Sequence, residues 1–110
     1  MTNTIITIKD KKYMICYDIN TLCLMKSEGY DVMKMDQIEM DILTIRALFY
    51  YGLLKFNNKP KMTLEKAGEL MSDYVANGGT FQEIAEIMMM ALYKGLGIKA
   101  ESTETNKLGE

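Results

Sequence analysis

One segment in the middle of the chain, residues 42–54, limits most strongly what this sequence can fold into. It carries a single charge, Arg46, among large apolar and aromatic side chains. It is too short to cross a bilayer as a helix, which takes about 20 apolar residues. A helix that is apolar on nearly every side must be covered on nearly every side. We therefore expect residues 42–54 to form a central helix around which the other elements pack.

The chain has the size of a single domain. Its 110 residues lie within the usual range for one domain. A chain of this length buries about two-thirds of its unfolded surface, which is enough for one core. We expect that domain to span residues 1–97. Residues 98–110 are small, polar and charged, and predict a disordered tail.

The N-terminal sequence predicts a β-hairpin. Residues 4–8 are β-branched throughout, residues 13–17 are apolar and aromatic, and the polar residues 9–12 between them have the length of a hairpin turn. An isolated hairpin is only marginally stable in water, so this one has to pack on helices or gain strands from a partner. The expected fold is therefore α+β and mostly α, with the hairpin followed by a bundle of about four helices.

A short helix is expected after the hairpin. Asp18 or Asn20 can serve as its N-cap, and the Glu28–Gly29 pair ends it. Its apolar face is predicted to contain Ile19, Leu22, Cys23 and Met25. Both cysteines, Cys16 and Cys23, are expected to be buried small hydrophobic residues of a reducing compartment.

The central helix is expected to begin at a capping box formed by Asp36 and Glu39, after a connector over residues 30–35. Gly52 lies inside this helix, where glycine costs about 1 kcal/mol relative to alanine. Such a glycine usually permits the close approach of another element. The side covered by the protein's own helices is predicted to contain Ile42, Ile45, Leu48 and Gly52.

Two further helices follow a loop over residues 55–62. Thr63 is the predicted N-cap of the first, and a capping box of Thr80 and Glu83 begins the second. Glycines near residues 78 and 95–97 end them. The expected buried positions of the first helix are Leu64, Ala67, Gly68, Met71, Tyr74 and Val75. Those of the second are Phe81, Ile84, Ala85, Met88, Ala91 and Leu92.

The composition argues against catalysis. The chain has no histidine, which removes the commonest general base and metal ligand, and its two cysteines lack zinc-ligand spacing. The carboxylates Asp36, Glu39 and Asp41 have the spacing of a helix cap and its solvated face. Gly78–Gly79 is not followed by the residues of a phosphate loop. We expect no enzyme activity, no cofactor and no metal site.

The location and the charge give two more expectations. The N-terminus lacks the basic and apolar regions of a signal peptide, which predicts a cytoplasmic protein with no membrane association. A net charge of −2 gives no electrostatic basis for nucleic-acid binding.

One motif keeps a DNA-binding alternative open. Residues 63–92 have the outline of a helix-turn-helix, in which the second helix would enter the major groove. That helix carries Glu83 and Glu86, and its one basic residue is Lys94. Phosphates would repel such a helix, so a small DNA-binding regulator is the alternative rather than the leading interpretation.

The chain also has a surplus of adaptable apolar side chains, including 11 methionines. Methionine and aromatic residues are enriched at protein interfaces. Some of them occupy positions outside the predicted core faces, or follow one another so closely that they cannot share one face. The candidate partner-binding residues are Phe49, Tyr50, Tyr51, Ile87, Met89, Met90 and Tyr93. The alternative is a central helix buried on all sides by the protein itself.

The order and spacing of these features resemble the tail assembly chaperones of long-tailed bacteriophages and prophages. The opening hairpin and the short helix ending at Glu28–Gly29 are followed by the aromatic end of the central helix. Motifs in the last two predicted helices add to the resemblance. The segments that carry the resemblance are Leu48-Phe49-Tyr50-Tyr51-Gly52-Leu53, Met62-Thr63-Leu64-Glu65-Lys66-Ala67, Asp73-Tyr74-Val75 with Gly78-Gly79, and Ala91-Leu92-Tyr93-Lys94-Gly95.

The resemblance implies a chaperone that works in the host cytoplasm during virion assembly and is absent from the mature virion. Its expected partners are the long, hydrophobic tape-measure protein, which it keeps soluble, and the tail-tube protein, which it helps to recruit. Neither nucleic acid nor a membrane is expected as a partner. Self-association into a homo-oligomer and the existence of a frameshift-extended form are left open.

Overall fold

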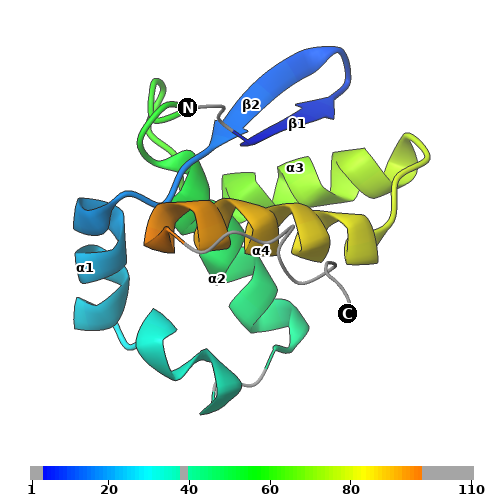
Figure 1. Ribbon diagram of the computed structural model, residues 1–110. Helices are drawn as coiled ribbons and strands as arrows, with labels where there is room; N and C mark the ends of the chain where they lie inside the picture. The colour runs from blue at the N-terminus through cyan, green and yellow to red at the C-terminus, as the bar shows by residue number, and fades with distance from the viewer. Residues whose placement is uncertain (1–3, 38–39, 98–110) are drawn as a thin grey trace.

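The computed structural model describes residues 4–37 and 40–97. It has the expected α+β fold, mostly α, in which an antiparallel hairpin precedes four α-helices within the described residues. Figure 1 shows the hairpin lying over α3 and α4, with α1 on one side of α2 and α3 on the other. The predicted tail over residues 98–110 lies outside the described residues.

The hairpin consists of β1 (Thr4–Ile8) and β2 (Lys11–Ile15). Its two-residue turn, Lys9–Asp10, has positive φ angles of 51° and 68°. Because both turn residues are left-handed, the ladder closes immediately and pairs Ile8 with Lys11. The second strand therefore begins at residue 11 and ends at 15, two residues earlier than predicted. The buried face of the hairpin contains Ile6, Ile8 and Ile15.

The first helix, α1 (Ile19–Ser27), is capped by Asp18, whose Oδ1 accepts a 2.8 Å hydrogen bond from the Thr21 amide. Gly29 follows the helix with a φ of 102°. The predicted apolar face is only partly correct, because Leu22 and Met25 are buried whereas Ile19 and Cys23 are exposed. Cys16 is only half-buried, so the expectation of two buried cysteines was wrong.

The central helix, α2 (Ile42–Leu53), begins later than predicted. Its N-cap is Asp41, which accepts a 2.9 Å hydrogen bond from the Thr44 amide. Asp36 instead lies in a short 3₁₀ helix, η1 (Val32–Gln37), and Glu39 lies outside the described residues. The prediction that Asp36 caps this helix was therefore wrong, because the capping hydrogen bond is made by Asp41, five residues later in the chain.

The last two helices match the sequence closely. Thr63 caps α3 (Leu64–Ala76), and Thr80 with Glu83 forms the predicted capping box of α4 (Phe81–Leu96). Gly97 ends α4 with a φ of 78°, whereas Gly95 lies inside its last turn. Most predicted core positions of these helices are buried or half-buried, but Leu64, Val75 and Phe81 are exposed.

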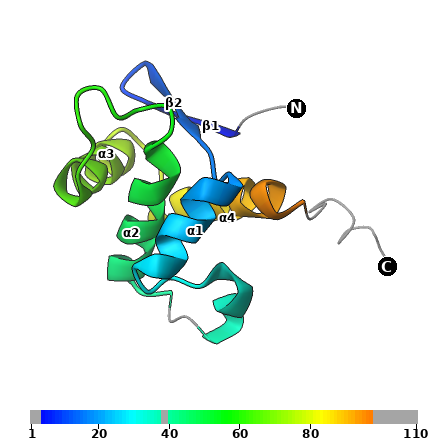
Figure 2. The same ribbon diagram turned by 90° about the vertical axis from the view of Figure 1, so that its left-hand side faces the viewer.

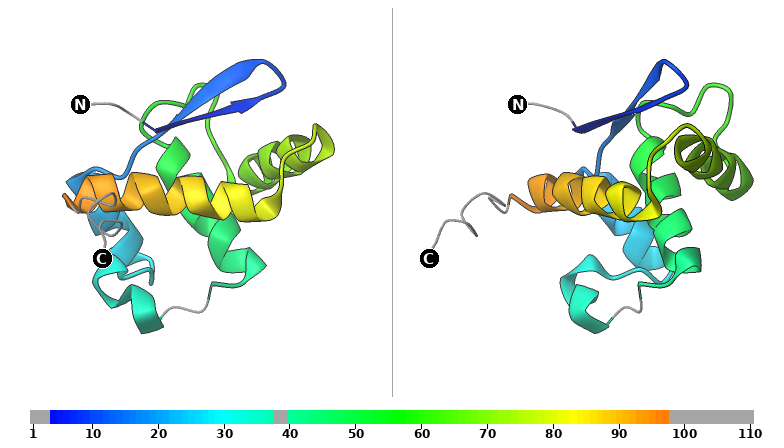
Figure 3. Two further views of the ribbon diagram at one scale, coloured as in Figure 1. Left: turned by 45° about the vertical axis from the view of Figure 1, so that its right-hand side comes forward. Right: turned by 90° about the vertical axis from the view of Figure 1, so that its right-hand side faces the viewer.

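The hydrophobic core is centred on the second half of α2. The elements α1, α3, α4 and β2 all pack against this helix. Figures 2 and 3 show α4 crossing α2 beneath the hairpin, with α1 beside α2. Phe49 and Leu53 of α2 are completely buried there. At the start of α2 the prediction fails, because Ile42 is 67% exposed rather than covered by the protein's own helices. Within the described ranges, no helix is long and apolar enough to span a membrane.

Candidate functional site

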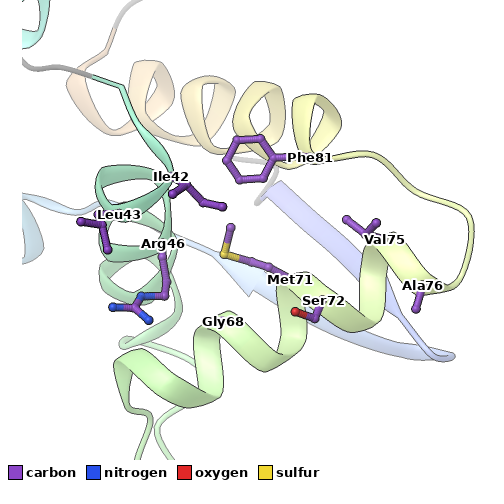
Figure 4. Close-up of a pocket in the computed structure, with 9 residues that line it drawn as sticks. All are labelled: Ile42, Leu43, Arg46, Gly68, Met71, Ser72, Val75, Ala76 and Phe81. Carbon is purple, nitrogen blue, oxygen red and sulfur yellow. The ribbon is translucent and has the colours of Figure 1, made fainter.

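An apolar groove lies between the start of α2, the outer side of α3 and the first residue of α4 (Figure 4). Its volume is about 640 Å³. All but one of the residues that line it are uncharged. The residues that line it are Ile42, Leu43, Arg46, Gly68, Met71, Ser72, Val75, Ala76 and Phe81.

The groove lies beside a close contact between α3 and α2. At Gly68, an added Cβ would lie 3.2 Å from Cδ of Arg46. Figure 4 shows α3 running from this contact toward its turn into α4, with space left between Val75 and the first turn of α2. Ile42 and Leu43 begin α2 on this open side and are 67% and 65% exposed. Two adjacent large aliphatic side chains are thus left without cover.

Met71 and Phe81 line the groove from α3 and α4. The Met71 side chain is buried at the bottom, and the ring of Phe81 projects from the first turn of α4 toward Ile42 and Met71 (Figure 4). Methionine and aromatic side chains give an apolar surface that adapts to different partners. This arrangement can bind apolar side chains but offers no set of groups for acid–base or nucleophilic chemistry.

Arg46 is the one charged residue that lines the groove. Figure 4 places its guanidinium at the α2 side, far from Val75 and Ala76. The Nε atom is buried, and it has no hydrogen-bond acceptor among the side chains and backbone groups that the structure describes. A buried donor without an acceptor costs about 1–3 kcal/mol. The groove therefore contains one unsatisfied polar group in an apolar setting.

None of the seven predicted partner-binding residues lines this groove. Phe49 is 0% exposed and Tyr51 is 5% exposed, so both are part of the protein's own core in this structure. The Tyr51 hydroxyl donates a hydrogen bond to Oε1 of Glu28. Burial, followed by the hydrogen bond to Glu28, raises the pKa of Tyr51 above its usual range.

Of the other five predicted residues, one lies on α2 and four lie on α4. Tyr50 is half-buried beside a second hollow of about 450 Å³, where its ring contacts that of Tyr51 with centroids 5.1 Å apart. On α4, Ile87, Met89 and Tyr93 are half-buried, and Met90 is exposed. The first two pack against the core as well.

Three of the groove residues were predicted to be buried because they continue regular apolar patterns. Ile42, Val75 and Phe81 have core spacing in sequence, but they lie at helix ends, where the neighbouring helices diverge. Helix-terminal position was the one signal that could have identified them. Their exposure depends on where α2 begins and on the direction of α3, neither of which periodicity defines.

The helix-turn-helix outline corresponds to α3, a short turn and α4. The exposed side of α4 carries the carboxylates of Glu83 and Glu86, so its charge remains unfavourable for a phosphate backbone. In the described part of the chain, no group of three or more histidine, cysteine, aspartate or glutamate residues could hold a metal ion.

Comparisons with protein-family models, with curated proteins and with solved structures find no match to this chain. The fold and the groove together define a small α+β protein with an apolar site lined by helices.

Proposed function

We propose that this protein is a tail assembly chaperone that binds and solubilises the tape-measure protein of a long-tailed phage or prophage. The observation that carries the proposal is the apolar groove, where Ile42 and Leu43 are left uncovered beside Met71 and Phe81. A protein that holds a hydrophobic partner in solution needs such a surface of its own. The resemblance of the motifs to that family supports the same function, including recruitment of tail-tube subunits.

The form of the groove favours a helical segment as its ligand. Its walls are α-helices, whose backbone groups are already hydrogen-bonded, so an extended peptide would find few backbone partners there. A helix satisfies its own backbone and can insert one apolar face between the walls. Tape-measure proteins are expected to be long and helical, which fits this mode of binding.

Charge disfavours the alternative, a DNA-binding regulator using α3 and α4. Glu83 and Glu86 are exposed on α4, and the groove beside this helix pair has Arg46 as its one charged residue. Binding to phosphates requires clustered basic residues and gives strong salt dependence. A salt-sensitive anisotropy change with duplex DNA would support the regulator instead.

The test is co-expression with a tape-measure protein encoded in a neighbouring reading frame. We expect the wild-type protein to keep the tape-measure protein soluble and to co-purify with it. Leu43→Asp should abolish both effects without lowering the thermal unfolding temperature. The matched control is Ile19→Asp, because Ile19 is also 65% exposed in a first helical turn but lies on α1, outside the groove.

The two kinds of failure are distinct. A wild-type protein that neither solubilises nor co-purifies with the tape-measure protein would contradict the chaperone function. Retention of the partner by Leu43→Asp would leave the chaperone function in place and exclude the groove. Substitution of Tyr50 or Met89 is a less specific test, since both pack against the core and their loss also affects folding.

A further inference from the structure

The Arg46 side chain has a charge that nothing described in the protein neutralises. The ion pairs of the described residues join Lys9 to Asp73, Lys26 to Asp31 and Lys55 to Asp18, and none of them includes Arg46. Its Nε is buried without an acceptor. Every other residue that lines the groove is uncharged. A guanidinium without a partner among the described residues therefore lies at the α2 edge of an apolar groove.

The stem of the Arg46 side chain lies against α3. The Arg46 stem lies over Gly68, where an added Cβ would be 3.2 Å from its Cδ. The residue as a whole is half-buried, so a ligand in the groove can reach it. Arginine presents its donors in a planar fork that matches the two oxygens of a carboxylate. Such charge-assisted bonds are stronger in surroundings that exclude water.

We infer that the groove selects an amphipathic helix carrying a carboxylate at the edge of its apolar face, where Asp or Glu pairs with Arg46. The inference rests on the proposed function, in which the groove binds a helix. Apolar side chains spaced i, i+3 or i+4, and i+7 along the ligand contact Ile42, Met71 and Phe81. The carboxylate lies at the α2 rim and satisfies the Arg46 donors. Apolar contacts thus supply affinity, and Arg46 selects the ligand and sets its orientation.

The experiment uses three designed 18-residue helical peptides, with a leucine face and alanine and lysine elsewhere. The three peptides differ at one position beside the leucine face, where they carry Glu, Gln or Lys. The set of three is repeated with the variable position placed at successive turns of the helix. Binding is measured by fluorescence anisotropy. At the best position, we expect the Glu peptide to bind the wild-type protein about tenfold more tightly than the Gln peptide, as one charge-assisted hydrogen bond implies. The Lys peptide should bind most weakly.

Arg46→Met keeps the apolar stem and removes the charge. We expect it to bind the Gln peptide within about threefold of wild type and to lose the preference for Glu. A structural role alone would weaken all three peptides equally. The preference of the wild-type protein should also decrease as salt is raised, because an ion pair at a partly exposed site is screened. Leu43→Asp, which alters the groove itself, should weaken all three peptides.

Equal affinity of the wild-type protein for the Glu and Gln peptides at every position would overturn the inference and leave helix binding and the chaperone function standing. Failure of all peptides to bind would exclude helix docking in the groove, and co-expression would then decide the chaperone function separately. A dimer in sedimentation that Leu43→Asp converts to a monomer would show that a second copy occupies the groove, and would also overturn the inference.

Discussion

The hydroxyl of Tyr17 donates a 2.5 Å hydrogen bond to the carbonyl oxygen of Leu48. Tyr17 follows β2 and is 2% exposed, and Leu48 lies in the middle of α2. One turn later, Gly52 leaves room for the tyrosine ring, since an added Cβ would lie 2.8 Å from its hydroxyl oxygen. The Gly52 carbonyl also accepts a 2.9 Å hydrogen bond from the Cys16 amide. The end of the hairpin is thus attached to the central helix through both side-chain and backbone groups.

Replacing Tyr17 with phenylalanine should lower the free energy of unfolding by about 1–2 kcal/mol, since a buried hydrogen bond is lost while the ring remains. Urea denaturation followed by circular dichroism measures this change. Tyr50→Phe is the matched control, because the Tyr50 ring is half-buried on the same helix as Leu48. The control should change stability by less than about 0.5 kcal/mol. Equal stability of wild type and Tyr17→Phe would show that the bond contributes nothing.

Stability should decrease at alkaline pH. Burial raises the pKa of Tyr17 and of Tyr51 above the usual value. In the unfolded chain both lose a proton near pH 10, whereas in the folded protein both keep it, so the unfolded state is favoured above about pH 10. The free energy of unfolding should be insensitive to these two groups below that pH. Above it, each should reduce the free energy of unfolding by up to about 1.4 kcal/mol per pH unit.

The measurement is urea denaturation at several values between about pH 9 and pH 11, with tyrosinate absorbance recorded in parallel. Tyr17→Phe should show a shallower alkaline decrease, because one of the two groups is removed. Ionisation of all tyrosines before any loss of structure would contradict this prediction.

Gly95→Ala should destabilise the protein by about 2 kcal/mol or more, although alanine is the better helix former. Its Cβ would lie 2.0 Å from the carbonyl oxygen of Tyr17, and this contact is with backbone, which cannot rotate away. Gly68→Ala is the matched control, since its Cβ meets only the flexible side chain of Arg46 at 3.2 Å. The control should be neutral or stabilising by up to about 1 kcal/mol. Thermal unfolding of both variants tests the difference, and similar losses would refute it.

Asp18 should stabilise the protein at neutral pH and lose that effect in acid. Hydrogen bonds from Lys55 and then from Thr21 lower the pKa of Asp18 to about 2. A lowered pKa gives a contribution that is complete above the unfolded value near pH 4 and lost as the pH falls toward 2. Allowing for solvent screening, Asp18→Ala should cost about 1 kcal/mol at pH 7.

Asp18→Asn provides the matched comparison for this cap. Asparagine keeps an oxygen that can accept from the Thr21 amide but cannot pair ionically with Lys55. It should retain most of the helix stabilisation at pH 7 and lose the dependence on acid. Equal acid dependence of the wild type and both variants in denaturation experiments at pH 7 and below would contradict this role of Asp18.

Structural features that depend on a few consecutive residues could be predicted from the sequence. Thr63 and Thr80 cap their helices as predicted, and Asp18, one of the two candidates for its helix, is the cap of α1. Each cap accepts a hydrogen bond from a backbone amide three residues away, which makes it a local feature. The close packing expected at Gly52 is also present, against Tyr17 and Ile15. The order of the elements and the fold class followed from such local signals together with apolar periodicity.

The register of the hairpin and the start of α2 needed the tertiary structure. Two left-handed residues, Lys9 and Asp10, shorten the turn, and the polar composition of residues 9–12 does not specify this. Both Asp36 and Asp41 have the chemistry of a helix cap. Only the path of the chain into α2 selects Asp41.

The surface that the protein leaves open was likewise decided by tertiary structure alone. The amino-acid sequence determined that residues 42–54 form an apolar helix with more surface than one face can bury. The directions of α3 and α4 determined that Phe49 is covered whereas Ile42 and Leu43 are not. Burial depends on where neighbouring helices converge and diverge. Periodicity identifies the apolar side of each helix, but it does not give the length over which a neighbour covers that side.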